Sequence, residues 1–361
     1  TVYFVDDTAA VDRLIAVNPG DCSQRWAVNL GAGAGTSSPT YWANPATADT
    51  NDDLIFVGAD KLYAFTIWGG LKWSVSLKTA PEVTTTVPST PLVIDPGGTW
   101  KVYAVNNVGD LYEVTNLTTT GTALRVADSP AGVHASGSLA AYKHNATDFY
   151  LYWGHLATLW RHNTAGGIGS LLLAGSLTDA TPVVDTPVVP SEPSVFIGST
   201  DGKVYGINGG TMLDLDGAGT VWPKIAAIST AGGLAILSSE LYVPSTDDRL
   251  RKYGALPGAC TGCNTDSLAE WPTFQHLTNR NGNSSYTVGA SPVQLWNRAP
   301  GGDVFPPIVG ETGLPGYAQG ITYFVTGRYL RALDIDTRNV IWSYDLGVAG
   351  NGPFTFATPA V

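Results

Sequence analysis

The sequence predicts an all-β fold, and three features of composition and pattern support this class. Only 14% of the 361 residues are charged, well below the roughly 25% of a typical soluble domain, whereas glycine (42 residues) and proline (23 residues) are abundant. Lysine and arginine together number 19 and there is one methionine, which leaves few residues suited to long helices. Short runs of aromatic and β-branched residues that end in turn residues recur along the chain, a pattern typical of strands.

One such strand pattern returns at a spacing of about 50 residues, with a last interval of about 80 residues. Its copies are TVYFVDD (1–7), DLIFVGA (53–59), KVYAVNN (101–107), DFYLYWG (148–154), SVFIGST (194–200), ELYVPST (240–246) and ITYFVTG (321–327). Most copies follow a short strand of small residues and lead into a second strand, a turn and a strand with tryptophan. Each unit therefore predicts one four-stranded antiparallel sheet. Because a lone sheet cannot bury both faces but a ring of sheets can, the repeat predicts a seven-bladed β-propeller.

The first copy has no small-residue strand ahead of it, and the chain ends in such a strand, FATPAV (356–361). We therefore expect the C-terminal strand to pair with the N-terminal strands and close the ring, which removes exposed sheet edges. A single propeller domain over 1–361 is predicted, and the absence of an initiator methionine favours a processed segment. Its blades are expected at about 36–77, 88–126, 135–174, 184–223, 229–271, 289–346, and 356–361 together with 1–30.

The long last interval predicts insertion loops at about 257–288 and 297–319, rich in turn residues. The first loop holds Cys260 and Cys263 in the sequence CTGCN, which lacks the histidine of a c-type haem attachment site. A short-loop disulfide between these two cysteines is expected if the protein is exported, and two free thiols are the alternative. Cys22 is left without a partner in this scheme, either buried or available for cross-linking.

The strand–LYALD–turn–Trp pattern, clearest in YLRALDIDTRNVIW (329–342), resembles the quinoprotein-like propeller repeat, the tryptophan-docking repeat. WPTFQHLTNRNG (271–282) is similar to a segment common in secreted members of that family. The resemblance covers nearly the whole chain and implies that the tryptophan ending each unit packs between neighbouring blades. A large flat side chain repeated once per sheet is also a good filler between sheets on physical grounds. The residues at this position are Trp26, Trp73, Trp222, Trp271 and Trp342.

The family includes quinone-cofactor dehydrogenases, an outer-membrane assembly lipoprotein and proteins resembling the propeller of the type IV pilus tip adhesin. The dehydrogenases are longer and carry adjacent cysteines over the quinone, whereas no two cysteines are adjacent here. We therefore expect a non-enzymatic, extracellular or surface-displayed binding or scaffold propeller, an adhesin or assembly component, with no required cofactor. A quinone- or metal-dependent oxidoreductase and a carbohydrate-binding propeller are the alternatives.

Charge narrows the partners that we expect. The formal net charge is −11 and the pI is about 4.7, so the chain would repel a phosphate backbone and nucleic-acid binding is disfavoured. No apolar run is long enough to span a membrane. A protein or a glycan at the cell surface is the expected partner.

Asp49, Asn51 and Asp53 stand at alternating positions, the spacing by which a loop wraps carboxylates around Ca²⁺. The sequence lacks the glycine expected at position six, and a solvated hairpin loop is the alternative interpretation. DLDG (214–217) is a weaker calcium candidate. Three glycosylation sequons are present, at Asn116, Asn145 and Asn283. Exposed tryptophans outside the docking set, such as Trp68, could stack on sugar rings.

Overall fold

The structure of the protein is a computed structural model, which describes part of the 361 residues. The described residues are 1–6, 11–18, 23–31, 37–47, 49–78, 85–128, 137–177, 180–185, 192–215, 224–225, 233–237, 240–245, 249–254, 283–284, 293–298, 308–309, 321–326, 329–335 and 337–345.

Antiparallel sheets make up this part of the chain, and four of them have four consecutive strands. They are β4 (Thr40–Trp42), β5 (Leu54–Gly58), β6 (Leu62–Thr66) and β7 (Leu71–Val75); β8 (Leu92–Ile94), β9 (Lys101–Val105), β10 (Leu111–Thr115) and β11 (Thr122–Ala127); β12 (Ala140–Lys143), β13 (Phe149–His155), β14 (Thr158–Asn163) and β15 (Ile168–Leu172); and β26 (Ile308–Val309), β27 (Ile321–Thr326), β28 (Tyr329–Asp334) and β29 (Val340–Asp345). The predicted all-β class with four-stranded antiparallel sheets is confirmed.

The remaining sheets depart from this plan. The first has three described strands, β1 (Val2–Asp6), β2 (Arg13–Val17) and β3 (Gln24–Asn29). Another contains β16 (Val183–Asp185), β17 (Ser194–Ser199), β18 (Lys203–Asn208) and β19 (Leu213–Asp214), with β20 (Lys224–Ile225) on β18 and β24 (Asn283–Ser284) parallel to β16. The last contains β21 (Ala235–Leu237), β22 (Glu240–Ser245), β23 (Arg249–Gly254) and β25 (Val293–Arg298).

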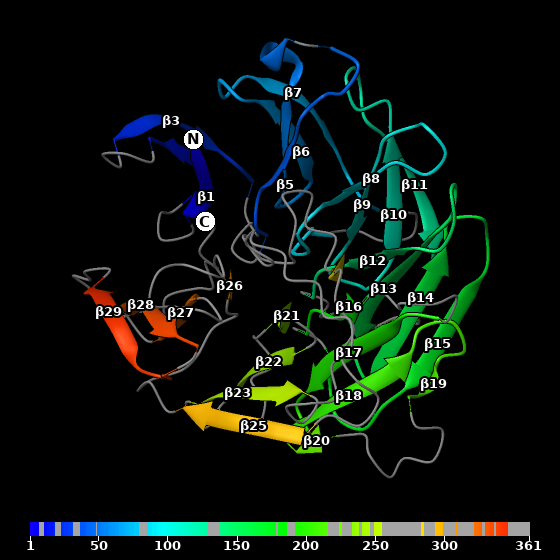
Figure 1. Ribbon diagram of the computed structural model, residues 1–361. Helices are drawn as coiled ribbons and strands as arrows, with labels where there is room; N and C mark the ends of the chain where they lie inside the picture. Colours follow the sequence, from blue (N-terminus) through cyan, green and yellow to red (C-terminus); the bar gives the residue numbers. More distant parts are fainter. Residues whose placement is uncertain are drawn as a thin grey trace.

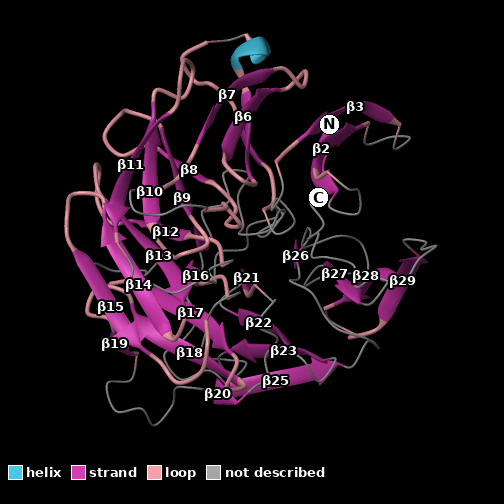
Figure 2. Ribbon diagram, turned by 180° about the vertical axis from the view of Figure 1, so that it is seen from behind, coloured by secondary structure: helices cyan, strands magenta, loops and turns pink. Residues whose placement is uncertain are grey.

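The sheets follow one another around a common centre (Figures 1 and 2). Inner strands such as β5 and β17 are buried along their whole length, whereas the outer strand β15 alternates between exposed and half-buried residues. The apolar core lies between neighbouring sheets rather than in one central mass. One cluster, for example, joins Phe56 and Trp73 of the β4–β7 sheet to Val102 and Tyr112 of the next sheet. The sheets β4–β7, β8–β11 and β12–β15 are therefore each stabilised by burial of both faces.

The pairing of β25 corrects the predicted boundaries 229–271 and 289–346. Residues 289–296 were expected to begin a new sheet, but Val293–Arg298 pairs with β23 as the outer strand of the earlier sheet. The next sheet begins at β26. The long insertion therefore falls between the third and fourth strands of one sheet. Such an insertion is tolerated because the entropy of closing a loop grows only slowly with its length.

Helix is scarce in the described part of the chain. Among the described residues, helical structure consists of one 3₁₀ turn, η1 (Thr50–Asp52). No helix in this part of the chain is long and apolar enough to cross a bilayer. The predicted closing strand, 356–361, lies outside the described residues, so ring closure and the count of seven blades stay predictions.

Candidate functional site

Two of the predicted docking tryptophans join neighbouring sheets. The indole Nε1–H of Trp26 on β3 donates a hydrogen bond to the carbonyl of Ile67, in the β6–β7 turn, at 2.9 Å. That of Trp73 on β7 donates to the carbonyl of Leu117, in the β10–β11 turn, at 2.6 Å. In both cases the outer strand of one sheet is fixed to the outer turn of the next.

A glycine in each receiving turn makes room for the indole ring. Gly69 has φ +86°, and a Cβ built there would lie 3.0 Å from the ring of Trp26. Gly121 has φ +58°, and a Cβ there would lie 2.6 Å from the ring of Trp73. Both turns thus need glycine for the left-handed backbone and for the close contact with the ring.

The strand register defines the docking position independently of side-chain contacts. Trp26 pairs with Ala16, Trp73 with Ala64 and Trp342 with Ala332, and each pair is followed by a β-bulge. Trp296 pairs with Lys252 and a bulge follows there too. In that sheet Trp296 therefore holds the register position that was predicted for Trp271. Trp271 and Trp222 lie outside the described residues.

At two of the described interfaces between sheets, another residue takes the place of the docking tryptophan. Leu124 on β11 pairs with Glu113 on β10, and Glu113 pairs with Tyr103 on β9. In the preceding sheet, Trp73 pairs with Ala64 and Ala64 pairs with Phe56 in the corresponding way. Leu124 therefore holds the docking position of its own sheet. Leu124 is 62% exposed. In the β14–β15 turn, which corresponds in chain order to the receiving turns at Gly69 and Gly121, a Cβ built at Gly166 would meet nothing within 4 Å.

In the next interface, Arg161 on β14 takes over the hydrogen bonds. Its guanidinium donates to the carbonyls of Gly209 (3.0 Å) and Gly210, in the β18–β19 turn. Its Cζ also lies 5.0 Å from the ring centroid of Tyr150. No sequence pattern marked this arginine, because it lies on the third strand rather than on the fourth.

The three residues of the calcium candidate have separate contacts. Asp53 is buried, and its carboxylate accepts hydrogen bonds from the Tyr41 hydroxyl and the Asn44 backbone N–H. Burial, and then the hydrogen bond to Asp53, raises the pKa of Tyr41 to about 12. Asp49 is exposed and accepts from the backbone N–H and the side-chain amide of Asn51 at 2.9 and 2.6 Å.

These contacts show Asp53 acting as an acceptor that fixes β4 and its following turn. Within the described ranges, no group of three or more His, Cys, Asp or Glu residues is arranged to hold a metal ion. The calcium site stays a prediction, which a calcium titration of the purified chain with an Asp49→Ala control would test.

The remaining predicted sites are partly described. Asn116 and Asn145 are exposed, and their side-chain amides donate to Thr122 and Asp148 within their own turns. Asn283 lies in β24. Cys22, Cys260 and Cys263 lie outside the described residues, so the disulfide and the glycosylation sites stay predictions.

Trp68 is the most exposed of the described tryptophans outside the docking set. It lies in the β6–β7 turn and is 57% exposed. Its Nε1–H donates to the Asn51 side-chain oxygen at 2.7 Å, and the Arg25 guanidinium carbon lies 5.6 Å from its ring centroid. The indole is therefore held in place at the surface by polar neighbours.

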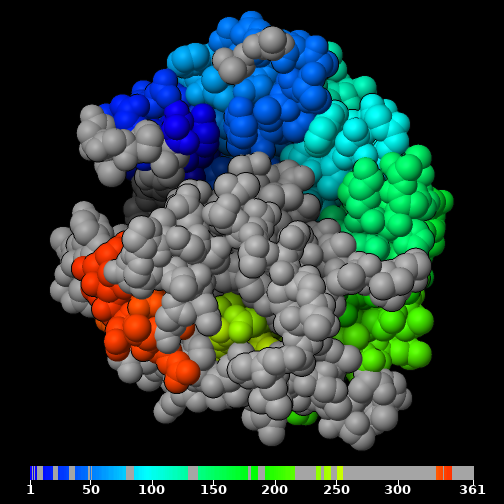
Figure 3. All heavy atoms as spheres, in the orientation of Figure 1, coloured from blue at the N-terminus to red at the C-terminus, as the bar shows by residue number. Residues whose placement is uncertain are grey.

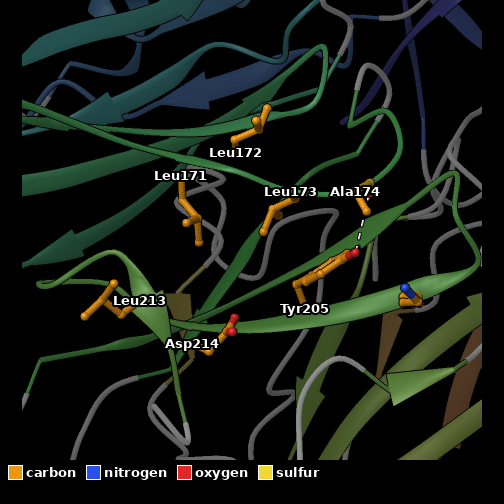
Figure 4. A pocket seen from close by; sticks show the side chains of 8 residues that line it. Leu171, Leu172, Leu173, Ala174, Tyr205, Leu213 and Asp214 are labelled. Atoms are coloured by element: carbon orange, nitrogen blue, oxygen red, sulfur yellow. Dashed lines mark hydrogen bonds between the residues drawn. The ribbon is translucent and has the colours of Figure 1, made fainter. Parts of the chain in front are cut away.

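An open apolar groove lies between the outer strands of two neighbouring sheets (Figure 4). Its volume is about 340 Å³, and the residues lining it are Leu171, Leu172, Leu173, Ala174, Lys203, Tyr205, Leu213 and Asp214. Leu171 and Leu173 point toward β19, whereas Leu172 points away from it (Figure 4). Leu172 is 75% exposed and Leu213 is 60% exposed. The β12–β15 sheet lies at the rim of the molecule, in green in Figure 3.

Polar groups border one end of this groove. The Tyr205 hydroxyl donates to the Asp201 carboxylate at 2.7 Å, and Lys203 Nζ lies 3.2 Å from the same carboxylate. Burial, and then the hydrogen bond to Asp201, raises the pKa of Tyr205 above its usual range. Burial alone would raise the pKa of Asp201, but hydrogen bonds from Tyr205, Ser199 and Lys203 outweigh it and lower that pKa. The charge of Lys203 is thereby balanced within the chain.

Comparison with known proteins supports the fold. No protein-family model matches the sequence, and no curated protein is similar to it in sequence. Among solved structures, the chain is similar to BamB from Moraxella catarrhalis, with TM-score 0.54 and 14% identity over 98% of this chain and 89% of that chain. It is also similar to a europium-containing methanol dehydrogenase, with TM-score 0.58 and 11% identity over 96% of this chain and 76% of that chain.

A third similar structure is that of BBS1N in complex with ARL6DN, with TM-score 0.50 and 10% identity over 90% of each chain. The fold and the repeated sheets thus define the chain as a β-propeller. Its structural neighbours include the BamB-like and quinoprotein (PQQ-type) propellers, which supports the resemblance found in the sequence. At these identities the likeness shows the fold alone, and fold does not fix activity.

Proposed function

We propose that this chain is a non-enzymatic binding or scaffold propeller, secreted or displayed at the cell surface, that binds a protein partner through the groove between β15 and β19. The exposed leucines Leu172 and Leu213 on either side of that groove carry the proposal. Exposed apolar side chains at a groove of this kind mark interaction sites in soluble proteins. One structural neighbour, BBS1N, was solved with a protein partner, which supports protein binding as a use of this fold.

The proposed architecture is a closed ring of seven blades, in which 356–361 supplies the fourth strand of the β1–β3 sheet. The support is that this sheet has three described strands whereas the complete ones have four. Deletion of 356–361 should lower the stability, and an added peptide of sequence FATPAV should restore it. Unchanged stability after the deletion would contradict closure.

A quinone- or metal-dependent oxidoreductase is the alternative from another class. The chain is as similar to a methanol dehydrogenase as to BamB, so the fold does not choose between the two functions. The residues fit the cofactor poorly. No two cysteines are adjacent, and no metal-binding group of three is assembled within the described ranges.

The decisive experiment combines a cofactor test with a partner test. An absorbance spectrum and metal analysis of protein purified from its native source should show no chromophore or redox metal near one per chain. The purified chain should inhibit attachment or assembly when added to native cells, and the Leu172→Lys/Leu213→Lys variant should inhibit less. Leu71→Lys, at a side chain 59% exposed on β7, is the matched control. A stoichiometric quinone would overturn the proposal.

Location is tested by protease treatment of intact native cells, in which the surface-displayed chain should be degraded. Carbohydrate binding remains a second candidate, because Trp68 is held at the surface with its Nε1–H fixed by Asn51. Aromatic faces stack on sugar rings in this manner. A glycan array probed with the native chain and with Trp68→Ala would detect it.

A further inference from the structure

We propose that β15 is an edge at which an extended segment of the partner protein adds as a further β-strand. The inference rests on the proposed function and specifies the partner's chemistry: an alternating apolar segment whose one charged residue is a basic residue opposite Asp214. Backbone hydrogen bonds to a sheet edge supply affinity in this mode, and the alternate side chains supply specificity.

The backbone of β15 has no described strand beside it on one side. β15 ends the strand order of its sheet and, among the described strands, pairs only with β14. Two hydrogen bonds to β14 flank it, from Asn163 N–H to the Gly167 carbonyl (3.0 Å) and from Leu173 N–H to the Ala157 carbonyl (2.8 Å).

Hydrogen-bonded pairs alternate along an antiparallel ladder. The residues whose N–H and C=O groups bond toward β14 are therefore the odd-numbered ones from 167 to 173. The N–H and C=O groups of Ile168, Ser170 and Leu172 consequently point to the open side. These same three residues carry the exposed side chains of the strand.

β15 also lacks the charged residues that protect sheet edges. Native proteins blunt an exposed edge with charged side chains or proline, yet no residue from Gly166 to Leu177 is charged or proline. Each of the other described outer strands contains a charged residue: Arg25 in β3, Lys72 in β7, Arg125 in β11, Asp214 in β19, Arg298 in β25 and Asp345 in β29. The unprotected edge and the groove therefore coincide at one place on the molecule.

Charge complementarity favours a separate partner over a second copy. Lys203 is paired with Asp201 at 3.2 Å, whereas Asp214 has no ion pair among the described residues. The chain carries a formal net charge of −11, so two copies would repel each other. A strand added to β15 would lie beside the groove that Leu213 and Asp214 line, so apolar and basic side chains on that strand would complement the surface.

The test uses fluorescence anisotropy with a labelled peptide of about seven residues, alternating valine and threonine with one lysine near its end. The full chain should bind this peptide. Leu172→Lys should weaken binding at least about tenfold by placing a charge on the edge. Ser170→Pro should do the same by removing an outward N–H without breaking a bond to β14. Leu71→Lys should bind like the native chain, and unchanged circular dichroism spectra verify folding.

Asp214→Asn identifies the charged contact. It should weaken binding of the lysine peptide but leave an all-neutral version of the peptide unaffected. Absence of peptide binding, or equal binding by all variants, overturns strand addition. If light scattering instead reveals a dimer that Leu172→Lys dissociates, the occupant is a second copy and a separate partner is refuted. The proposed function fails separately, through a bound quinone or loss of the inhibition in native cells.

Discussion

Trp73 should be among the most important single side chains for stability, because it links two sheets. It is 5% exposed, its ring centroid lies 5.8 Å from that of Phe56, and its Nε1–H donates to the Leu117 carbonyl. Truncating a buried tryptophan to alanine costs about 3–5 kcal/mol. We therefore expect Trp73→Ala to lower the free energy of unfolding by about 4 kcal/mol, measured by urea denaturation followed by far-UV circular dichroism. Trp342→Ala, at the same register but 41% exposed, should cost clearly less.

A double-mutant cycle with Gly121 isolates the contact between ring and turn. In the native background Gly121→Ala has two costs: about 1–2 kcal/mol for a left-handed alanine, and the displacement of the Trp73 ring, which would lie 2.6 Å from the new Cβ. In the Trp73→Ala background the second cost disappears. The two substitutions together should therefore destabilise less than the sum of their separate effects, by about 1–2 kcal/mol. Additivity within about 0.5 kcal/mol would refute the docking argument.

Three further predictions concern other parts of the described structure. Leu124→Trp should stabilise the protein by about 1 kcal/mol, because its ring can pack on the open turn at Gly166; an unchanged or lower urea midpoint would contradict this. Burial lowers the pKa of His162, so the unfolded state takes up its proton first as pH falls below about 6.5. Stability should then fall between that pH and the lower folded pKa, and His162→Gln should flatten the curve there; an unchanged slope would count against the burial argument. Although burial alone would raise the pKa of Asp201, its hydrogen bonds lower that pKa. The contribution of the Asp201 carboxylate to folding stability should therefore be present above about pH 3.9 and be lost as the pH falls through the pKa of the folded state. Asp201→Asn should reduce stability at neutral pH and converge with the native chain in acid; equal stability at neutral pH would show that the carboxylate contributes nothing.

The register of the outer strands shows where sequence reasoning succeeded and where it failed. Tryptophans close to their own hairpin, such as Trp73, could be placed because the third and fourth strands are adjacent in the chain and the turn between them is short. Trp296 was missed because about 40 residues separate β23 from β25, and no local pattern reports which strand pairs with which across such a gap.

The groove was not predicted either, although part of its signal is present in the sequence. The run from Gly166 to Leu177 has no charged residue, which is unusual for an outer strand. Its neighbours in the groove, Leu213 and Asp214, come from another sheet, and only the packing of the two sheets brings them together. The same holds for Arg161, whose acceptors Gly209 and Gly210 are about 50 residues away in the chain.

The amino-acid sequence alone determined the all-β class, the repeating four-stranded unit and the docking position of the tryptophans near short hairpins. These follow from side-chain alternation, turn residues and periodic spacing, all of which act over a few residues or repeat along the chain. Only the tertiary structure decided that Val293–Arg298 completes the earlier sheet, that Arg161 replaces an indole, and that β15 and β19 flank an open apolar groove. These features depend on contacts between segments that are distant in the chain. Such contacts are selected by the free energy of packing of the whole fold, and no local sequence pattern encodes them.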